Sequence, residues 1–238
     1  MRTAALAHAP GGTLYRVVVP GARLRLLVLA ADGGGDGGGD IGGCVGGCVG
    51  VDLDTGAFVR AAHPAGADPP GAFEVVEGEI AGAVEPPDPA RPEALELAAP
   101  PRPVGRLSVR RADRLLAPLH HPPRLPLLGL AADAVPYWTL SGDSPSLALV
   151  DLRADARLRA GESGAECHFN WQGVDHDLPF TDGRLLAAIE RQFTIRPTRG
   201  DVQRLLGYRP RRLLVLLTAP IDGYCHKTVA ALLPGGRG

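Results

Sequence analysis

The sequence is poor in aromatic residues and almost devoid of lysine. Only 5% of the residues are aromatic, and Lys227 is the one lysine among 25 basic residues, so the remaining basic charge is arginine. This bias, together with abundant alanine, glycine and proline, indicates a GC-rich coding genome and weakens any motif defined only by Gly or Arg. The formal net charge of -1 excludes a bulk electrostatic attraction to nucleic acid, so such binding has to come from a local patch.

Cysteines, signal sequences and long apolar runs are also scarce. The four cysteines, Cys44, Cys48, Cys167 and Cys225, are too few and too scattered to predict a disulfide framework. The first residues lack the basic start and long apolar stretch of a signal peptide. No apolar run approaches the roughly 20 residues that span a bilayer. We therefore expect a cytoplasmic protein in a reducing compartment, without a membrane association.

Glycine and proline, in contrast, are frequent. The 32 glycines and 23 prolines in 238 residues favour many short strands and turns over long helices. The length allows about one to two domains. Strands are followed by a Pro-interrupted junction, further strands, one helix and a closing hairpin, and this order favours two small antiparallel β units over one α/β sheet.

The individual elements follow from apolar runs and turn signals. In the first half, strands are predicted over residues 23–31, 48–53, 57–61, 75–80 and 94–98, with a strand turning into a short helix over 105–116. In the second half, strands are predicted over residues 146–156, 166–171, 174–180, 213–217 and 228–232, with a helix from Thr181 or Asp182 to Phe193 and a loop or short helix over 199–208. Residues 86–103 are rich in proline and are predicted to be largely extended and exposed.

The Gly-rich stretch Asp32–Gly47 is predicted to be a flexible loop, because glycine loses the most backbone entropy on ordering. It follows a strand, as the glycines of a dinucleotide-binding motif do. That motif needs a helix opening at its last glycine, whereas these glycines lead into another strand. The pattern therefore argues against nucleotide binding by this loop.

The closing stretch, Arg212–Pro234, is predicted to form a hairpin around Pro220–Gly223. Side chains on a strand alternate between its two faces. This alternation places Cys225, Val229 and Ala231 on one face and Tyr224, His226 and Thr228 on the other. We expect the first face to be core and the second to be a polar surface that carries rings.

Segments from both halves share an order and spacing with one known family. They are LLVLAADGGG, GGCVGVDLDTGAFVRAAHP (Gly46–Pro64), SLALV (Ser146–Val150), FNWQGVDHDLPFTD (Phe169–Asp182) and PIDGYCHKTVAALLP (Pro220–Pro234). Together they resemble the bacterial dual OB-containing domain family, which has two OB-type barrels in tandem, and the resemblance covers roughly Arg23 to Pro234. Two features depart from the family: a Gly/Asp tract replaces a short polar and basic stretch after the first strand, and His226 stands where an aromatic residue is usual.

From the element order and this resemblance we expect a mainly β fold of two tandem small OB-like β-barrels with one or two short helices. The expected organisation is an N-terminal extension (1–20), a first barrel (21–118), a Pro-rich junction (119–136) and a second barrel (137–236) with a helix near 182–193. OB barrels as a class bind single-stranded nucleic acid or other oligomers across a strand face. The resemblance therefore implies a binding protein.

The leading hypothesis is non-catalytic binding of single-stranded DNA or RNA, or of a nucleotide-containing ligand. Such a binder needs flat rings on which bases stack and cations that follow the backbone. The candidate ligand-binding residues are Arg60, His63, Phe169, Trp171, Tyr224, His226 and Lys227. Structural alternatives stay open: barrel core for Phe169 and Trp171, a salt bridge for Arg60, and packing for Tyr224 and His226. A protein-protein interaction or scaffold subunit of a bacterial complex is the alternative from another class.

Metal, cofactor and catalytic sites are not predicted. Cys44 and Cys48, with the pairs Cys167-His168 and Cys225-His226, offer zinc donors, but neighbours on a strand point to opposite faces, so each pair can supply only one ligand. A small enzyme with a cysteine nucleophile and His168, His176 or His226 as base is the third alternative. Alternation separates His176 from Asp175 and Asp177, and this stretch is typical of an exposed edge hairpin.

Overall fold

The computed structural model of the protein describes residues 6–8, 14–16, 18–32, 44–64, 69–84, 87–142, 145–152, 154–161, 164–192 and 198–235. The fold is mainly β, with 48% of the described residues in strands. It contains a closed five-stranded barrel, a half-barrel sheet and, within the described residues, three short α-helices, which fits two tandem small barrels. The predicted fold class is thereby confirmed.

Five strands close the first barrel. They are β3 (Arg23–Asp32), β4 (Cys44–Asp52), β5 (Phe58–Pro64), β6 (Glu74–Ala83) and β7 (Ala94–Leu97). β3 pairs antiparallel with β4 and β6, β4 pairs antiparallel with β5, and β6 pairs antiparallel with β7. A parallel pairing between β5 and β7 completes the circle. This barrel is consistent with an OB-like fold.

Apolar residues on both faces of β3 explain its continuous apolar sequence. Leu24, Leu26 and Val28 fill the barrel interior, whereas Leu27 and Leu29 lie on the outer face in a second buried cluster. A strand that is buried on both faces reads as an apolar run instead of an alternation. β3 is therefore central to the molecule, and its prediction from the sequence is confirmed.

Shorter elements flank the barrel. They are β1 (Leu6–His8), β2 (Leu14–Arg16), β8 (Arg102–Arg106) and the helix α1 (Val109–Leu116). β2 reaches the barrel through Tyr15, which lies opposite Phe58 of β5, and β8 pairs with β6. Of the predicted Gly-rich loop, Asp32 belongs to β3 and residues 44–47 to β4, and residues 33–43 lie outside the described residues.

The Pro-rich segment is more buried than predicted. Ala90, Glu93, Leu95 and Leu97 are all buried. The physical reason is that β7 supplies the strand that closes the barrel, so its leucines have to point into the core. Residues 98–100 are exposed, as is β8, which begins at the far end of the segment.

The second half is built from two sheets. They comprise β9 (Ala134–Pro136), β10 (Leu147–Asp151), β14 (Pro210–Leu217) and β15 (Tyr224–Pro234) in one, and β11 (Arg157–Gly161), β12 (Gly164–Trp171) and β13 (Val174–Pro179) in the other. Phe180, just after β13, forms a parallel bridge to Val229 of β15 and so connects the two sheets. The closing hairpin and the hairpin about Gln172-Gly173 are confirmed.

Two helices, α2 (Gly183–Gln192) and α3 (Arg199–Leu206), cover the second half. The carboxylate of Asp182 accepts a hydrogen bond from the backbone N–H of Leu185 at 3.0 Å, as expected of a helix N-cap. Leu185 is buried in the second core. The prediction of a helix after Asp182 is confirmed. No helix in the described ranges has the length and apolar character needed to cross a membrane.

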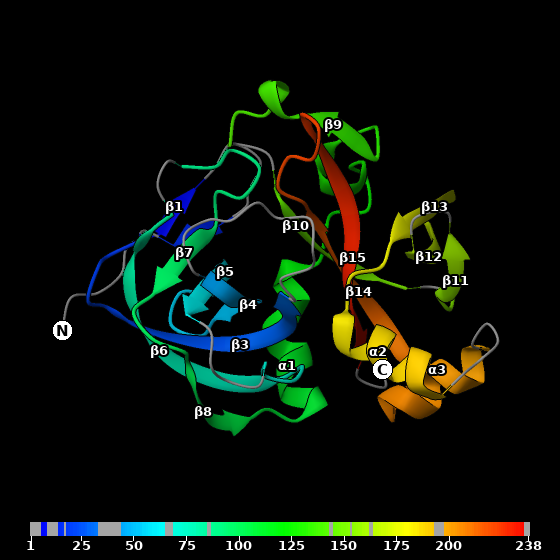
Figure 1. The fold of residues 1–238 in the computed structure, drawn as a ribbon, viewed down its shortest axis with the longest axis horizontal. Helices are drawn as coiled ribbons and strands as arrows, with labels where there is room; N and C mark the ends of the chain where they lie inside the picture. The colour runs from blue at the N-terminus through cyan, green and yellow to red at the C-terminus, as the bar shows by residue number, and fades with distance from the viewer. Residues whose placement is uncertain are drawn as a thin grey trace.

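One apolar cluster joins the two halves. It combines Leu27 and Leu29 of β3 with Leu149 of β10 and with Leu214 and Leu216 of β14. Figure 1 shows β14 and β15 running between the first barrel and the β11–β12–β13 sheet. The outer face of the first barrel is therefore packed against the second half.

Candidate functional site

An aromatic patch lies where β15 begins. We define it by Trp138, Ile221 and Tyr224, whose side chains are exposed, Trp138 by 71% and Tyr224 by 42%. The centroids of the Trp138 and Tyr224 rings are 5.9 Å apart, with an edge-to-face angle of 67°. Two rings in this geometry leave ring surface open to solvent, which is what a stacking ligand requires.

Local backbone geometry holds the aromatic patch together. The N–H of Tyr137 donates to the carbonyl of Gly223 at 2.9 Å, and Tyr224 pairs with Pro136 of β9. Gly223 has a φ of 84°, and a Cβ there would lie 3.4 Å from a Trp138 ring carbon. Glycine therefore suits both the turn and the close packing of the indole against it.

Tyr224 and His226 lie on one face of β15, but the predicted polar surface does not continue to Thr228, which is buried because the later part of β15 is covered on both faces. The His226 side chain is half-buried, and its backbone N–H donates to the hydroxyl of Thr218 at 2.9 Å. Trp138 was not among the predicted site residues. The only sequence signal for it was a rare tryptophan beside a proline and a tyrosine, which does not distinguish an exposed ring from a buried one.

Phe169 and Trp171 lie in the core of the second half. Both are buried in one apolar cluster with Cys167, so the structure matches the core alternative for these two rings. The imidazole of His176 stacks on Phe169, with centroids 5.2 Å apart. Their rings are covered by protein and not open to a ligand surface.

Arg60 forms a buried contact between the halves. Val59 and Ala61 point into the first barrel, so Arg60 points outward. Its Nε donates to Glu93 at 3.0 Å and its Nη1 donates to the carbonyl of Leu217 at 3.2 Å. The other carboxylate oxygen of Glu93 accepts a hydrogen bond from the hydroxyl of Ser146. The salt-bridge alternative for Arg60 therefore matches the structure.

The contact of Arg60 with Leu217 covers part of the outer face of β5 and so limits where a ligand can bind. An OB barrel usually receives its ligand on the face of its second and third strands, which are β4 and β5 here. The outer face of β5 at Arg60 meets Leu217 at the end of β14, and Val49 and Val51 of β4 lie in the apolar cluster between the halves. His63, near the end of β5, is buried, and its Nδ1 lies 2.9 Å from the carbonyl of Pro64. The described part of this face is thus covered by the protein itself.

Lys227, the only lysine in the sequence, has a buried side chain. Its side chain is 1% exposed and lies on the core face with Cys225 and Val229. Its Nζ donates to the carbonyl of Leu130 at 2.8 Å and lies 3.3 Å from the carboxylate of Asp133. Burial lowers the pKa of Lys227, and the Asp133 carboxylate opposes this shift. The ammonium thus fixes the segment before β9 onto β15.

His176 lies close to the same carboxylate. Its Nδ1 is 3.7 Å from Asp133, and burial lowers the pKa of His176 more than this carboxylate raises it. Asp177 instead lies opposite His168, 3.0 Å from its Nδ1 on an exposed edge with Arg159. The separation of His176 from Asp177 therefore agrees with the strand alternation.

Cys167 and Cys225 are poor nucleophiles. Both thiols are buried, as is Cys48. Burial raises the pKa of Cys167 to about 12 and that of Cys225 to about 11. The thiolate is the reactive form, so both stay protonated and unreactive near neutral pH. In the described ranges, no three His, Cys, Asp or Glu side chains cluster as metal ligands would.

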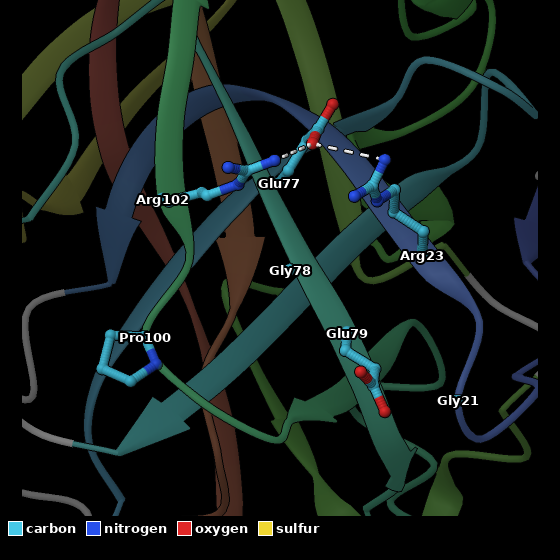
Figure 2. A pocket seen from close by; sticks show the side chains of 7 residues that line it. All are labelled: Gly21, Arg23, Glu77, Gly78, Glu79, Pro100 and Arg102. Atoms are coloured by element: carbon cyan, nitrogen blue, oxygen red, sulfur yellow. Dashed lines mark hydrogen bonds and ion pairs between the residues drawn. The ribbon is translucent and has the colours of Figure 1, made fainter.

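A shallow cavity of about 370 Å³ lies on the outer side of β6. Figure 2 shows the side chains of Arg23 and Arg102 reaching Glu77 from two sides, with Glu79 pointing away. Glu77 lies 3.1 Å from Arg102, 3.4 Å from Arg25 and 3.8 Å from Arg23. The carboxylates offset much of the positive charge, and no aromatic ring lines the cavity. It therefore lacks the features of a base-binding site.

Comparisons with known proteins give no relative. The chain matches no family model, no curated protein and no solved structure. Of the seven predicted site residues, Tyr224 is exposed, His226 is half-buried and the other five are buried. Contact of any of them with a ligand stays a prediction. Tyr224 and its neighbour Trp138 are the best candidates, because their rings are exposed and adjacent.

Proposed function

We propose that the protein binds single-stranded nucleic acid without catalysis, and that bases stack on Trp138 and Tyr224. The observation that carries this proposal is the exposed edge-to-face ring pair at the start of β15. An exposed indole is costly, because large apolar surfaces are normally covered in a folded protein. Stacking of a base on an aromatic side chain is worth about 1–3 kcal/mol and tolerates any base sequence.

Two further observations support the proposal. The closed barrel is consistent with an OB-like fold, and because several segments resemble those of the dual OB-containing domain family in their order, we retain membership of that family as part of the proposal. The raised pKa values of Cys167 and Cys225 oppose a cysteine-based reaction. We place the function in a bacterial cytoplasm, because the free buried thiols of Cys167 and Cys225 suit a reducing compartment.

A protein partner is the second candidate. Ile221 is exposed and its backbone pairs with that of Tyr224, and tryptophan and tyrosine dominate the energetics of many protein interfaces. A binding experiment with oligonucleotides separates the two candidates, because a protein-docking patch has no affinity for an isolated nucleic acid strand.

The test is fluorescence-anisotropy titration of labelled single-stranded DNA and RNA with the intact protein. The double variant Trp138→Ala/Tyr224→Ala is expected to bind at least about 30-fold more weakly, since two stacking contacts are lost. The matched control is Leu125→Ala/Val174→Ala, which removes two exposed apolar side chains elsewhere and is expected to bind as the unaltered protein does. No binding by the unaltered protein at low salt would reject the proposal in favour of a protein partner.

A further inference from the structure

The outer face of α1 carries a concentration of arginine. Arg110, Arg111 and Arg114 are exposed on the helix, and Arg106 is exposed just before it. The helix buries Ala112 and Leu116 in the cluster between the halves, so its basic face has to point to solvent. We name these four arginines the α1 cationic face.

The positive charge of this face is not neutralised. Within the described ranges, Arg110, Arg111 and Arg114 take part in no ion pair. The guanidinium of Arg106 donates a hydrogen bond to the carbonyl of Ala72 at 3.3 Å. The one acid on the helix, Asp113, is directed inward.

Asp113 pairs with Arg212 of β14, whose Nε also lies 3.1 Å from Asp151. The Asp113 carboxylate is therefore paired in the interior and does not neutralise Arg110, Arg111 or Arg114, while Arg106 lies opposite Glu74 of β6 without an ion pair to it. In a chain with a net charge of -1, such a local excess creates a surface that attracts anions.

The α1 cationic face and the aromatic patch lie near opposite ends of β15. A cavity of about 400 Å³ next to Arg106 is lined by Ser108 and Tyr208, and also by Pro234 at the end of β15. The aromatic patch contains Tyr224 at the start of the same strand. At about 3.3 Å per residue, the two ends of β15 lie roughly 33 Å apart, and Figure 1 shows α1 and β9 well separated.

We propose that the α1 cationic face binds the phosphate backbone of the nucleic acid whose bases stack on the aromatic patch. This inference rests on the proposed function. Single-strand binding combines ring platforms with a positive surface that follows the backbone, and the aromatic patch supplies only the first of these. At about 3.4 Å per stacked nucleotide, a strand of roughly ten nucleotides bridges the two surfaces.

The spacing of the arginines favours a polynucleotide over an acidic protein. Arg110 and Arg114 are one helical turn apart on α1, about 6 Å along the axis, and Arg106 ends β8 just before the helix. Each guanidinium can donate two parallel hydrogen bonds to a phosphate, so the two helical arginines can bind successive phosphates of one strand.

The test measures the salt dependence of binding to a labelled oligothymidylate of about 15 nucleotides, between about 50 and 200 mM salt. The variant is Arg110→Gln/Arg114→Gln, in which glutamine keeps a similar helix propensity. The slope of log K against log salt is negative, and each lost phosphate contact reduces its magnitude by about 0.7 for a single strand, so we expect the slope of the variant to be less negative by about 1.4. The control Arg124→Gln/Arg191→Gln removes the same charge from exposed positions outside α1 and is expected to leave the slope unchanged.

The outcomes separate this inference from the proposed function. If the unaltered protein binds and the α1 variant has the same slope, the cationic face is rejected and the stacking site is not affected. If Trp138→Ala/Tyr224→Ala weakens binding but keeps the slope, the two surfaces act separately, as expected. Equal displacement of the oligonucleotide by polyglutamate of the same charge would overturn the assignment to nucleic acid. An unaltered protein that binds no strand would overturn both proposals.

Discussion

Arg60 on the first barrel donates a hydrogen bond to the carbonyl oxygen of Leu217, which lies 157 residues later in the chain. The same guanidinium pairs with the fully buried carboxylate of Glu93. A residue that sequence patterns assign to a ligand surface thus holds the two halves together. Because this contact covers the β5 face at Arg60, a ligand has to bind another surface, such as the aromatic patch.

Removing Arg60 is expected to be costly. The substitution Arg60→Met leaves the buried Glu93 carboxylate with Ser146 but without its cation, and breaking a buried pair in this way costs about 3–5 kcal/mol. The free energy of unfolding from urea denaturation checks this. The double variant Arg60→Met/Glu93→Gln removes the unpaired charge and is expected to recover part of the loss. A loss below about 1 kcal/mol for Arg60→Met would show that the pair does not hold the halves together.

Gly50 is expected to be intolerant of any side chain. A Cβ on Gly50 would lie 2.2 Å from the carbonyl oxygen of Leu27 on the neighbouring strand, so Gly50→Ala forces the backbones of β3 and β4 apart. Such overpacking typically costs about 1–3 kcal/mol or more. Gly82→Ala is the matched control, since nothing lies within 4 Å of a Cβ there. Equal stability of the two variants by thermal denaturation would contradict the close approach.

Acid is expected to destabilise the protein through buried histidines. Burial lowers the pKa of His121 and of His176 below the ordinary value of 6.5. Above pH 6.5 both states carry neutral imidazoles, so this contribution to stability is fully present. Between pH 6.5 and the lowered folded pKa values the unfolded chain binds more protons, so the free energy of unfolding falls as the pH falls.

Urea denaturation at several pH values measures this effect. The variant His121→Gln/His176→Gln is expected to lose less stability than the unaltered protein when the pH is lowered from about 7 to about 5, because it lacks the two titrating groups. A steeper loss in the variant would show that these histidines gain protons more readily in the folded state.

The thiols of Cys167 and Cys225 are expected to be inert in the folded protein. Their raised pKa values and complete burial leave no accessible thiolate at pH 8. Iodoacetamide labelling followed by peptide mass spectrometry should therefore modify both residues only after unfolding in urea. Rapid labelling of either residue in the native protein would revive the alternative of a cysteine enzyme.

Local sequence patterns predicted the elements better than the site. The apolar run of β3 and the turn with Pro, Asp and Gly before β15 depend on neighbouring residues, so the sequence predicts them. The burial of Lys227 could not be predicted in this way. Strand alternation puts it on the core face with Cys225, but its charge suggested a surface, and the groups that satisfy it, Leu130 and Asp133, are remote in sequence.

Exposure of rings depends on tertiary contacts in the same way. Phe169 lies on a predicted strand and Tyr224 in the predicted closing hairpin, yet Phe169 is buried in the second core and Tyr224 is exposed. Trp138 became a candidate only because β9 pairs with β15 and brings its indole to Tyr224. No periodicity in the sequence predicts the pairing of β9 with β15, since β9 is only three residues long.

The most direct measurement of base stacking uses the intrinsic fluorescence of Trp138. The chain has two tryptophans, so Trp171→Phe leaves Trp138 as the only indole. Addition of unlabelled oligothymidylate at low salt is predicted to quench this emission in a saturable way, and the quenching is predicted to weaken in Trp171→Phe/Tyr224→Ala. Saturable binding seen by anisotropy with an unchanged Trp138 emission would contradict stacking at the aromatic patch.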